Sequence, residues 1–206
     1  MKESLYTISA GTVLAVCLWM AVFYLPGGSF WIKMSAGAAA ASGYAFYPGR
    51  AKLKQLLNWR WVYLLYGILS AGLLYMIFFA GGKLSELVFN FAADQIASVY
   101  SMKQGGSELI LGALLFLVIA PGEEIFWRGF LQEKVSVLVD SKSIGYIAVS
   151  LLYGAVHLWA VNFMLFMAAL VCGFFWGYVF NKTGGLWPGI ISHSIWDVAI
   201  FILFPV

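Results

Sequence analysis

Six ionisable side chains lie in stretches of the sequence that are otherwise almost entirely apolar. They are Glu123, Glu124, Arg128, His157, His193 and Asp197. The chain has only two histidines, and both belong to this set. Ionisable groups placed in long apolar segments are costly, and they usually serve a function. Carboxylates combined with imidazoles are the groups of general acid–base catalysis, of proton relays and of metal binding.

The two adjacent acids begin the motif EEIFWR, which ends at Arg128. Glu124 and Arg128 are four residues apart, so on a helix they share a face in the order favoured for an ion pair. Glu123 is turned by about 100° from Glu124 on the same helix. The spacing therefore predicts a Glu124–Arg128 pair and a Glu123 carboxylate that is free to act as a general base. A buried ion-pair network that only fixes helix packing is the alternative, but one acid would suffice for it.

Both histidines also occur in pairs of residues with helical spacing. Tyr153 precedes His157 by four residues, and His193 precedes Asp197 by four, so each pair shares a helix face. A single buried histidine is more often a satisfied core residue than a catalyst. Two of them, together with two acids on a third helix, favour one shared site.

The composition places these stretches in a lipid bilayer. Of the 206 residues, 63% are hydrophobic and 10% are charged, whereas a soluble domain is about half apolar and about a quarter charged. A membrane-spanning helix needs roughly 20 mostly apolar residues. The sequence thus predicts an all-α, polytopic membrane helical bundle of about seven transmembrane helices that forms a single domain over residues 1–206. The expected spans are 5–26, 30–47, 61–81, 109–132, 144–161, 163–181 and 187–204.

The basic residues indicate orientation instead of a nucleic-acid-binding face. Residues 48–60 carry several lysines and arginines and no acid, and the positive-inside rule places such a stretch in the cytoplasm. Counting spans from there puts the N-terminus in the cytoplasm and the C-terminus outside. We therefore expect a multi-pass integral membrane protein with this orientation. The basic residues on the expected inner side are Arg50, Lys52, Lys54, Arg60, Lys134, Lys142 and Lys182.

This orientation also gives an expected depth for the site. At 1.5 Å per residue, Glu123 lies roughly 18 Å and His157 roughly 21 Å from the inner ends of their helices, with His193 shallower. We expect the groups to converge in the inner half of the membrane. The segment 83–107 falls outside in this arrangement, and its amphipathic stretch from Leu84 to Val99 is either a surface-lying helix or an ordered loop.

The three motifs, in this order, resemble the CPBP family of intramembrane proteases, which includes the CAAX-processing endopeptidases and the bacterial Abi-type enzymes. The family signature is E-E-x-x-x-R, then F-x-x-x-H, then H-x-x-x-N. The short, membrane-only chain resembles the compact prokaryotic members, which implies a location in the prokaryotic plasma membrane. The resemblance covers residues 108–204, the expected catalytic core, and the chain departs from it at two positions. Tyr153 replaces phenylalanine and Asp197 replaces asparagine. The matching positions are Glu123-Glu124-x-x-x-Arg128, Tyr153-x-x-x-His157 and His193-x-x-x-Asp197.

The resemblance implies a role for each of the six residues. Glu123 with His157 would activate a water, and His193 with Asp197 would stabilise the tetrahedral oxyanion. Arg128 would hold Glu124. Because an ionised aspartate cannot donate a hydrogen bond, Asp197 would either be protonated or orient His193.

A metal is the open question of this assignment. The family has been described both as glutamate-type proteases without a metal and as metalloproteases. His157, His193 and Glu123 would be the ligands of a Zn²⁺ with one position left for water. No local ligand spacing in the sequence demands a metal, so the sequence favours the metal-free form.

Two other classes of protein use buried ionisable groups. A proton-coupled transporter or channel would be expected to show internal repeats and paired broken helices, and the sequence shows neither. A non-catalytic immunity or scaffold protein would be expected to lose motif residues, whereas this chain has the two acids, the arginine and both histidines. The sequence therefore favours an endopeptidase acting on a membrane-associated or exported peptide or protein, with a C-terminal sorting enzyme of the same family as the alternative.

Overall fold

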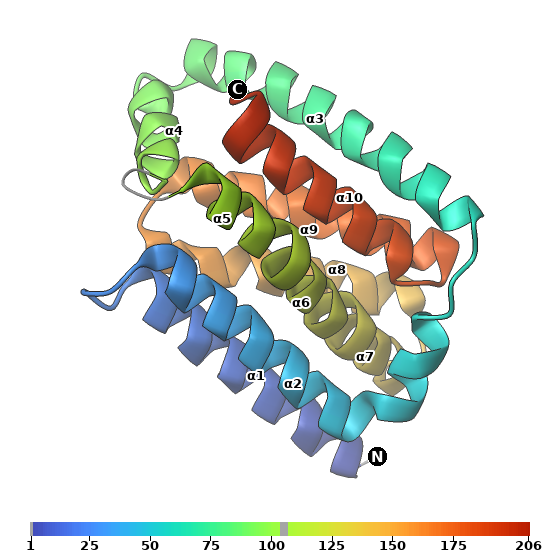
Figure 1. Cartoon of the computed structure of the whole chain (residues 1–206). Helices are drawn as coiled ribbons and strands as arrows, with labels where there is room; N and C mark the ends of the chain where they lie inside the picture. Colours follow the sequence, from blue (N-terminus) through green and yellow to red (C-terminus); the bar gives the residue numbers. More distant parts are fainter. Residues whose placement is uncertain (1, 104–106) are drawn as a thin grey trace.

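The computed structural model describes residues 2–103 and 107–206, and within these ranges it consists of helices and short connections. The long helices run side by side, up and down along one direction (Figure 1). This confirms the all-α bundle expected from the composition. The first four helices are α1 (Lys2–Phe23), α2 (Phe30–Leu56), α3 (Val62–Val88) and α4 (Ala92–Ser101).

One long helix, Glu108–Leu138, follows and carries the two adjacent acids. Regular turns alternate in it with π-helical turns, which widen the backbone. One of the π-helical stretches ends two residues before Pro121, whose ring would collide with the carbonyl one regular turn earlier. Its parts are α5 (Glu108–Leu114), η1 (Leu115–Ile119), α6 (Ala120–Glu124), η2 (Ile125–Gln132) and α7 (Glu133–Leu138).

The last part of the chain forms three helices whose ends are set by local signals. Ser141 and Asn162 accept hydrogen bonds from backbone N–H groups at the starts of α8 and α9, as N-cap residues do. Gly184 has a φ of 65° directly after α9, the left-handed conformation in which glycine commonly ends a helix. The elements are α8 (Lys142–Val156), η3 (His157–Ala160), α9 (Phe163–Thr183), α10 (Trp187–Val198) and η4 (Ala199–Leu203).

Each apolar stretch expected to span the membrane is a helix in the structure. Among the described residues, five helices are long and apolar enough to cross a bilayer: Ser4–Phe23, Val62–Val88, Glu108–Leu138, Lys142–Ala160 and Phe163–Thr183. The apolar helix Trp187–Leu203 is shorter, and α2 is long but is not among these five. A polytopic membrane protein is thus confirmed, and the number of seven spans stays a prediction.

The two ends of the bundle differ in charge. We call the end at which α2, α7 and α9 finish the basic end, because the basic residues of 50–60, 134–142 and 182 lie there. Lys52 pairs with Glu133 at 2.8 Å, and the backbone N–H of Leu186 donates to Leu56. The opposite end holds α4, η3 and the α1–α2 connection, and the C-terminus also lies there (Figure 1).

Close helix packing in the centre depends on small residues. A Cβ on Gly122 would lie 2.9 Å from the backbone oxygen of Ala38, and one on Gly173 would lie 2.9 Å from that of Ser150. The Gly/Ala-rich α2 therefore approaches the helix with the two acids at backbone contact, as small residues permit in membrane proteins. Elsewhere α10 packs mainly on α3, and α8 packs mainly on α9.

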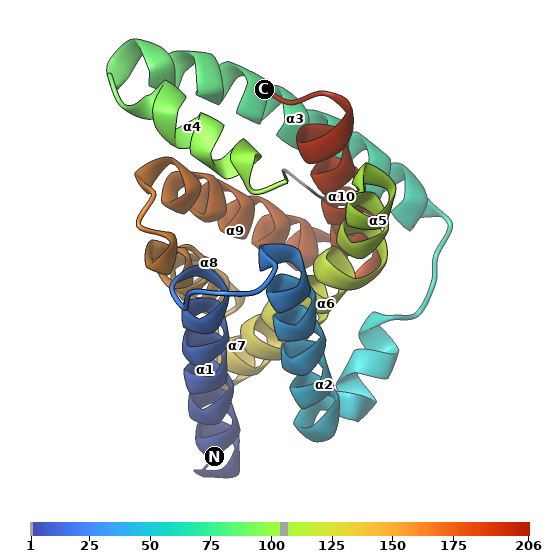
Figure 2. The ribbon, with the colours of Figure 1, turned by 60° about the vertical axis from the view of Figure 1, so that its left-hand side comes forward.

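The segment after α3 is more helical than a loop. The helix α3 continues to Val88, beyond the expected end at residue 81, and the amphipathic α4 follows after a short turn. This helix lies between α3 and α9 at the opposite end of the bundle (Figure 2). Hydrogen bonds from Asn162 to the Gln95 backbone and from the Met164 backbone to the Gln95 side chain hold it there. The end of the expected segment, residues 104–106, lies outside the described residues.

Candidate active site

The two adjacent acids face different surroundings. Glu124 is fully buried, and its Oε1 accepts from Arg128 Nη1 at 2.9 Å. The guanidinium of Arg128 lies over the rings of Tyr153 and Trp176, and its Nη2 is 3.4 Å from the backbone oxygens of Cys172 and Gly173. The structure thus forms the ion pair that the four-residue spacing predicts. The pair is made although the helix is π-helical, not regular, from Ile125 onwards.

Glu123 points to the other side of the helix and is free of Arg128. Its Oε2 accepts a 2.7 Å hydrogen bond from the hydroxyl of Tyr153, and it makes no other hydrogen bond among the described residues. Glu123 lines a cavity, whereas Glu124 and Arg128 do not. The phenylalanine that is commoner at this position would lack the hydroxyl and could not make this contact. The tyrosine at position 153 was the only feature of the sequence that could have indicated it.

His157 begins the short 3₁₀ turn that ends α8. Its Nδ1 is 2.7 Å from the backbone oxygen of Tyr153, and its Nε2 is 3.3 Å from the indole nitrogen of Trp19. Since the carbonyl only accepts and the indole only donates, Nδ1 carries the proton and Nε2 receives the indole N–H. Tyr153 therefore connects the two residues of the cavity: its hydroxyl binds Glu123, and its carbonyl orients His157.

His193 is held between two carboxylates and an aromatic ring. Its Nδ1 lies 3.0 Å from Glu124 Oε1, and its Nε2 lies 3.5 Å from Asp197 Oδ2. Trp176 stacks on the imidazole with ring centres 3.6 Å apart, and the Trp176 indole donates to Ser192 at 3.1 Å. The orientation of His193 is thus fixed on three sides. Trp19 and Trp176 were not among the residues singled out in the sequence, because apolar stretches contain many tryptophans.

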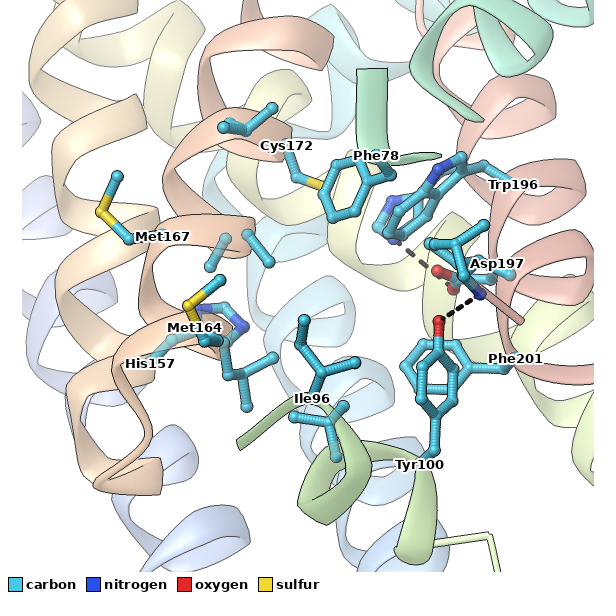
Figure 3. A pocket seen from close by; sticks show the side chains of 18 of the residues that line it. Phe78, Ile96, Tyr100, His157, Met164, Met167, Cys172, Trp196, Asp197 and Phe201 are labelled. Carbon is cyan, nitrogen blue, oxygen red and sulfur yellow. Dashed lines mark hydrogen bonds and ion pairs between the residues drawn. The ribbon is translucent and has the colours of Figure 1, made fainter. Parts of the chain in front are cut away.

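One cavity brings the remaining groups together. It has a volume of about 330 Å³, and Glu123, His157, His193 and Asp197 lie in its wall. Figure 3 shows His157 on one side of this cavity and Asp197 on the other, with α4 along its edge. Apolar walls with a few convergent polar groups are typical of ligand sites. The helices that carry these four residues are far apart in sequence but enclose the same space.

The distance expected for His157 along its helix agrees with the structure, but a location in the inner half of the membrane does not follow from that distance. This residue lies directly after α8, which begins at Lys142 near the basic end. Fifteen residues of helix carry His157 about 22 Å away from that start, which is more than half of a hydrocarbon core about 30 Å thick. His193 lies only about 9 Å along its helix from Trp187. The site therefore extends from the middle of the bundle towards the opposite end.

A zinc ion does not fit the side chains as they are arranged. Among residues 4–103 and 107–206, no three histidine, cysteine, aspartate or glutamate side chains converge in a way that could hold a metal. The expected set of His157, His193 and Glu123 is thus not assembled. Both nitrogens of each imidazole already face a protein group, so neither imidazole has a free lone pair to offer a metal ion.

The fold and the cavity define a helical membrane protein with a buried carboxylate–histidine site. Residues 105–199 match the family described as Rce1-like, type II CAAX prenyl endopeptidase, and all of the candidate residues lie inside this segment. This part of the chain is similar to that family of CAAX proteases, and the resemblance expected from the motifs is confirmed. No curated protein and no solved structure matches the chain.

Proposed function

We propose that this protein is an intramembrane endopeptidase that hydrolyses a peptide bond of a membrane-associated or exported substrate with a water activated by Glu123 and His157. The family supports an endopeptidase in general. The observation that carries the specific proposal is the division of the two acids: Glu123 faces the cavity with the histidines, whereas Glu124 is paired behind it.

Glu123 takes the larger share of water activation. One of its oxygens accepts from Tyr153, and the other is free to take a proton from water. The Nε2 of His157 already accepts from Trp19, so His157 assists where water takes the place of the indole N–H. The activated water attacks the carbonyl carbon of the substrate, and its proton passes to Glu123.

His193, as a positively charged imidazolium, stabilises the negative oxyanion that this attack produces. Each of its ring nitrogens faces a carboxylate oxygen, an arrangement that suits an imidazolium donating in both directions. A cation held in a site away from water stabilises a developing negative charge strongly. Asp197 lies beside His193 and, when protonated, is a second donor. When the tetrahedral intermediate collapses, Glu123 returns the proton to the departing amine nitrogen, so that one water is consumed per bond broken.

Glu124 and Arg128 position the site without touching the substrate. The Glu124 carboxylate joins Arg128 on one side to His193 on the other through the same oxygen. Its second oxygen, Oε2, has no hydrogen-bond partner among the described residues, and a Cβ on Gly189 would lie 2.6 Å from it. The absence of a side chain at Gly189 therefore lets this carboxylate reach His193.

The direct test is cleavage by the purified protein in lipid vesicles. The probes are single-span reporter polypeptides with different apolar segments, tagged at both ends. We expect the wild type to cut at least one of them and a Glu123→Gln variant prepared in the same way to cut none. Equal cleavage by both proteins, or no cleavage of any reporter by the wild type, would contradict the proposal.

Replacing Asp197 by asparagine distinguishes a role as a hydrogen-bond donor from a role as a metal ligand. The asparagine amide would supply a permanent N–H donor, so activity should survive, and the pH profile should extend to more alkaline pH, where a protonated acid loses its donor. The measurement is the cleavage rate of one accepted reporter across pH, with and without a chelator. An inactive Asp197→Asn variant that added Zn²⁺ restores would contradict the metal-free mechanism, since aspartate would then be acting as a ligand.

A further inference from the structure

The cavity is displaced towards one end of the bundle. Beyond the candidate catalytic groups, much of its wall comes from the last turns of α3, from α4 and from the first half of α9. The end of α1, the start of α2 and the last residues of the chain, up to Val206, also contribute. All of these elements lie at the end opposite the basic end (Figure 1). No residue of the α2–α3 or α7–α8 connections lines the cavity.

The wall is open to the side between α3 and α9. Ile77 of α3 is 39% exposed, and Met167 and Val171 of α9 are 39% and 37% exposed, although all three line the cavity. These two helices make few contacts with each other, and α4 bridges them at the end of the bundle. In a bilayer, the exposed faces of α3 and α9 meet lipid, so the opening between them leads from the lipid to the catalytic groups.

No charged side chain lies at this opening. The ionisable side chains of the wall, other than those of the candidate catalytic groups, are Tyr100, Tyr153 and Cys172, and no lysine or arginine of the described chain contributes to it. Figure 3 shows side chains such as Phe78, Ile96 and Met164 around the space. Charged segments would lose their hydration here without compensation. The occupant is therefore apolar and uncharged.

The charges at the two ends fix which side of the membrane this is. Lysines and arginines outnumber the acids at the basic end, where Glu133 and Asp140 also lie, and the positive-inside rule places such an end in the cytoplasm. At the opposite end, Lys33, Lys83 and Lys103 are balanced by acids. Those acids are Glu86, Asp94 and Glu108. The opening thus lies in the half of the bilayer away from the cytoplasm.

We infer that the substrate is an apolar membrane-spanning segment of an exported polypeptide, which enters sideways between α3 and α9 beneath α4 and is cut in the extracytoplasmic half of the bilayer. This inference rests on the proposed function.

Thiol labelling tests the side from which the cavity is reached. Ser85 lines the cavity in the last turn of α3, and Asn58 lies at the basic end. In a background with Cys17 and Cys172 replaced by alanine, Ser85→Cys should react with a membrane-impermeant maleimide added to intact cells. Asn58→Cys should react with the same maleimide only after the membrane has been permeabilised. Labelling of Ser85→Cys only from the cytoplasmic side, or from neither side, would overturn the inference.

Blocking the opening tests the path. Gly82 lines the cavity on α3, and a Cβ there would meet no atom within 4 Å; the same open space surrounds Gly72 on the same helix, which does not line the cavity. A Gly82→Phe variant should cut the reporter accepted by the wild type at least about tenfold more slowly, because its ring occupies the path that positions the substrate. Gly72→Phe should stay within about twofold of the wild type.

The outcomes separate this inference from the proposed function. Full activity of Gly82→Phe, or equal losses in both variants, would contradict the lateral path but not the proposed endopeptidase function. Absence of cleavage by the wild type would contradict the proposed endopeptidase function instead. The labelling of Ser85→Cys decides the side of the cavity in either case, because it needs no substrate.

Discussion

Replacing Glu123 by glutamine is expected to abolish peptide hydrolysis while leaving the helical bundle folded. The carboxylate is the group in the cavity that is free to take a proton from water, and glutamine has almost the same shape but cannot act as a base. Loss of a general base costs about 100- to 10,000-fold in rate. The Oε1 of a glutamine can still accept from Tyr153, so the local packing is kept. The measurement is the cleavage rate of an accepted reporter.

The control for this variant is its thermal stability in the same detergent. The midpoint of unfolding should remain close to that of the wild type, because Glu123 is not part of the Arg128 ion pair. Tyr153→Phe is a second comparison that restores the commoner residue of the family motif and removes only the hydroxyl. Glu123→Gln with wild-type cleavage would show that another group activates the water.

Replacing Glu124 by glutamine is expected to produce the opposite result, a large loss of stability. The carboxylate is fully buried and is the partner of both Arg128 and His193. An amide would leave the buried guanidinium without a counter-charge, which costs about 3–5 kcal/mol in comparable buried pairs. The measurement is the unfolding midpoint of the purified variant compared with that of the wild type.

Glu133→Gln is the matched control for this loss. Glu133 pairs with Lys52 at 2.8 Å, but both side chains are accessible to solvent, and such surface pairs contribute about 0–1 kcal/mol. The same chemical change should therefore be almost silent there. Equal stability of Glu123→Gln and Glu124→Gln, combined with activity lost only in the latter, would mean that the two acids have exchanged roles.

The features that could be predicted from the sequence are those with a local cause. The apolar segments are helices because their length and composition leave the backbone no other way to satisfy its polar groups in lipid. The Glu124–Arg128 pair follows from a spacing of four residues on one helix. The orientation of Glu123 away from that pair follows from the same helical period. The catalytic roles of these residues remain proposals.

The features that could not be predicted are those that depend on tertiary packing. Trp19 reaches His157 across 138 positions of the chain, and nothing in either local sequence indicates that contact. The stacking of Trp176 on His193 is of the same kind. The inner-half location of the site did not follow from the helix counting, because a distance of about 21 Å for His157 already exceeds half of a hydrocarbon core about 30 Å thick. The extension of α3 to Val88 was missed because polar residues, beginning at Lys83, were taken as the end of the span.

The hydrogen bond from Trp19 to His157 joins two parts of the chain that differ in their similarity to known proteins. The candidate catalytic groups belong to the segment that matches the CAAX prenyl endopeptidase family, but Trp19 lies well before that segment begins at residue 105. The lateral opening lies between α3 and α9, and of these two helices only α9 belongs to that segment. Substitutions in α3 and α4 can therefore change which segments reach the cavity while the candidate catalytic residues stay the same.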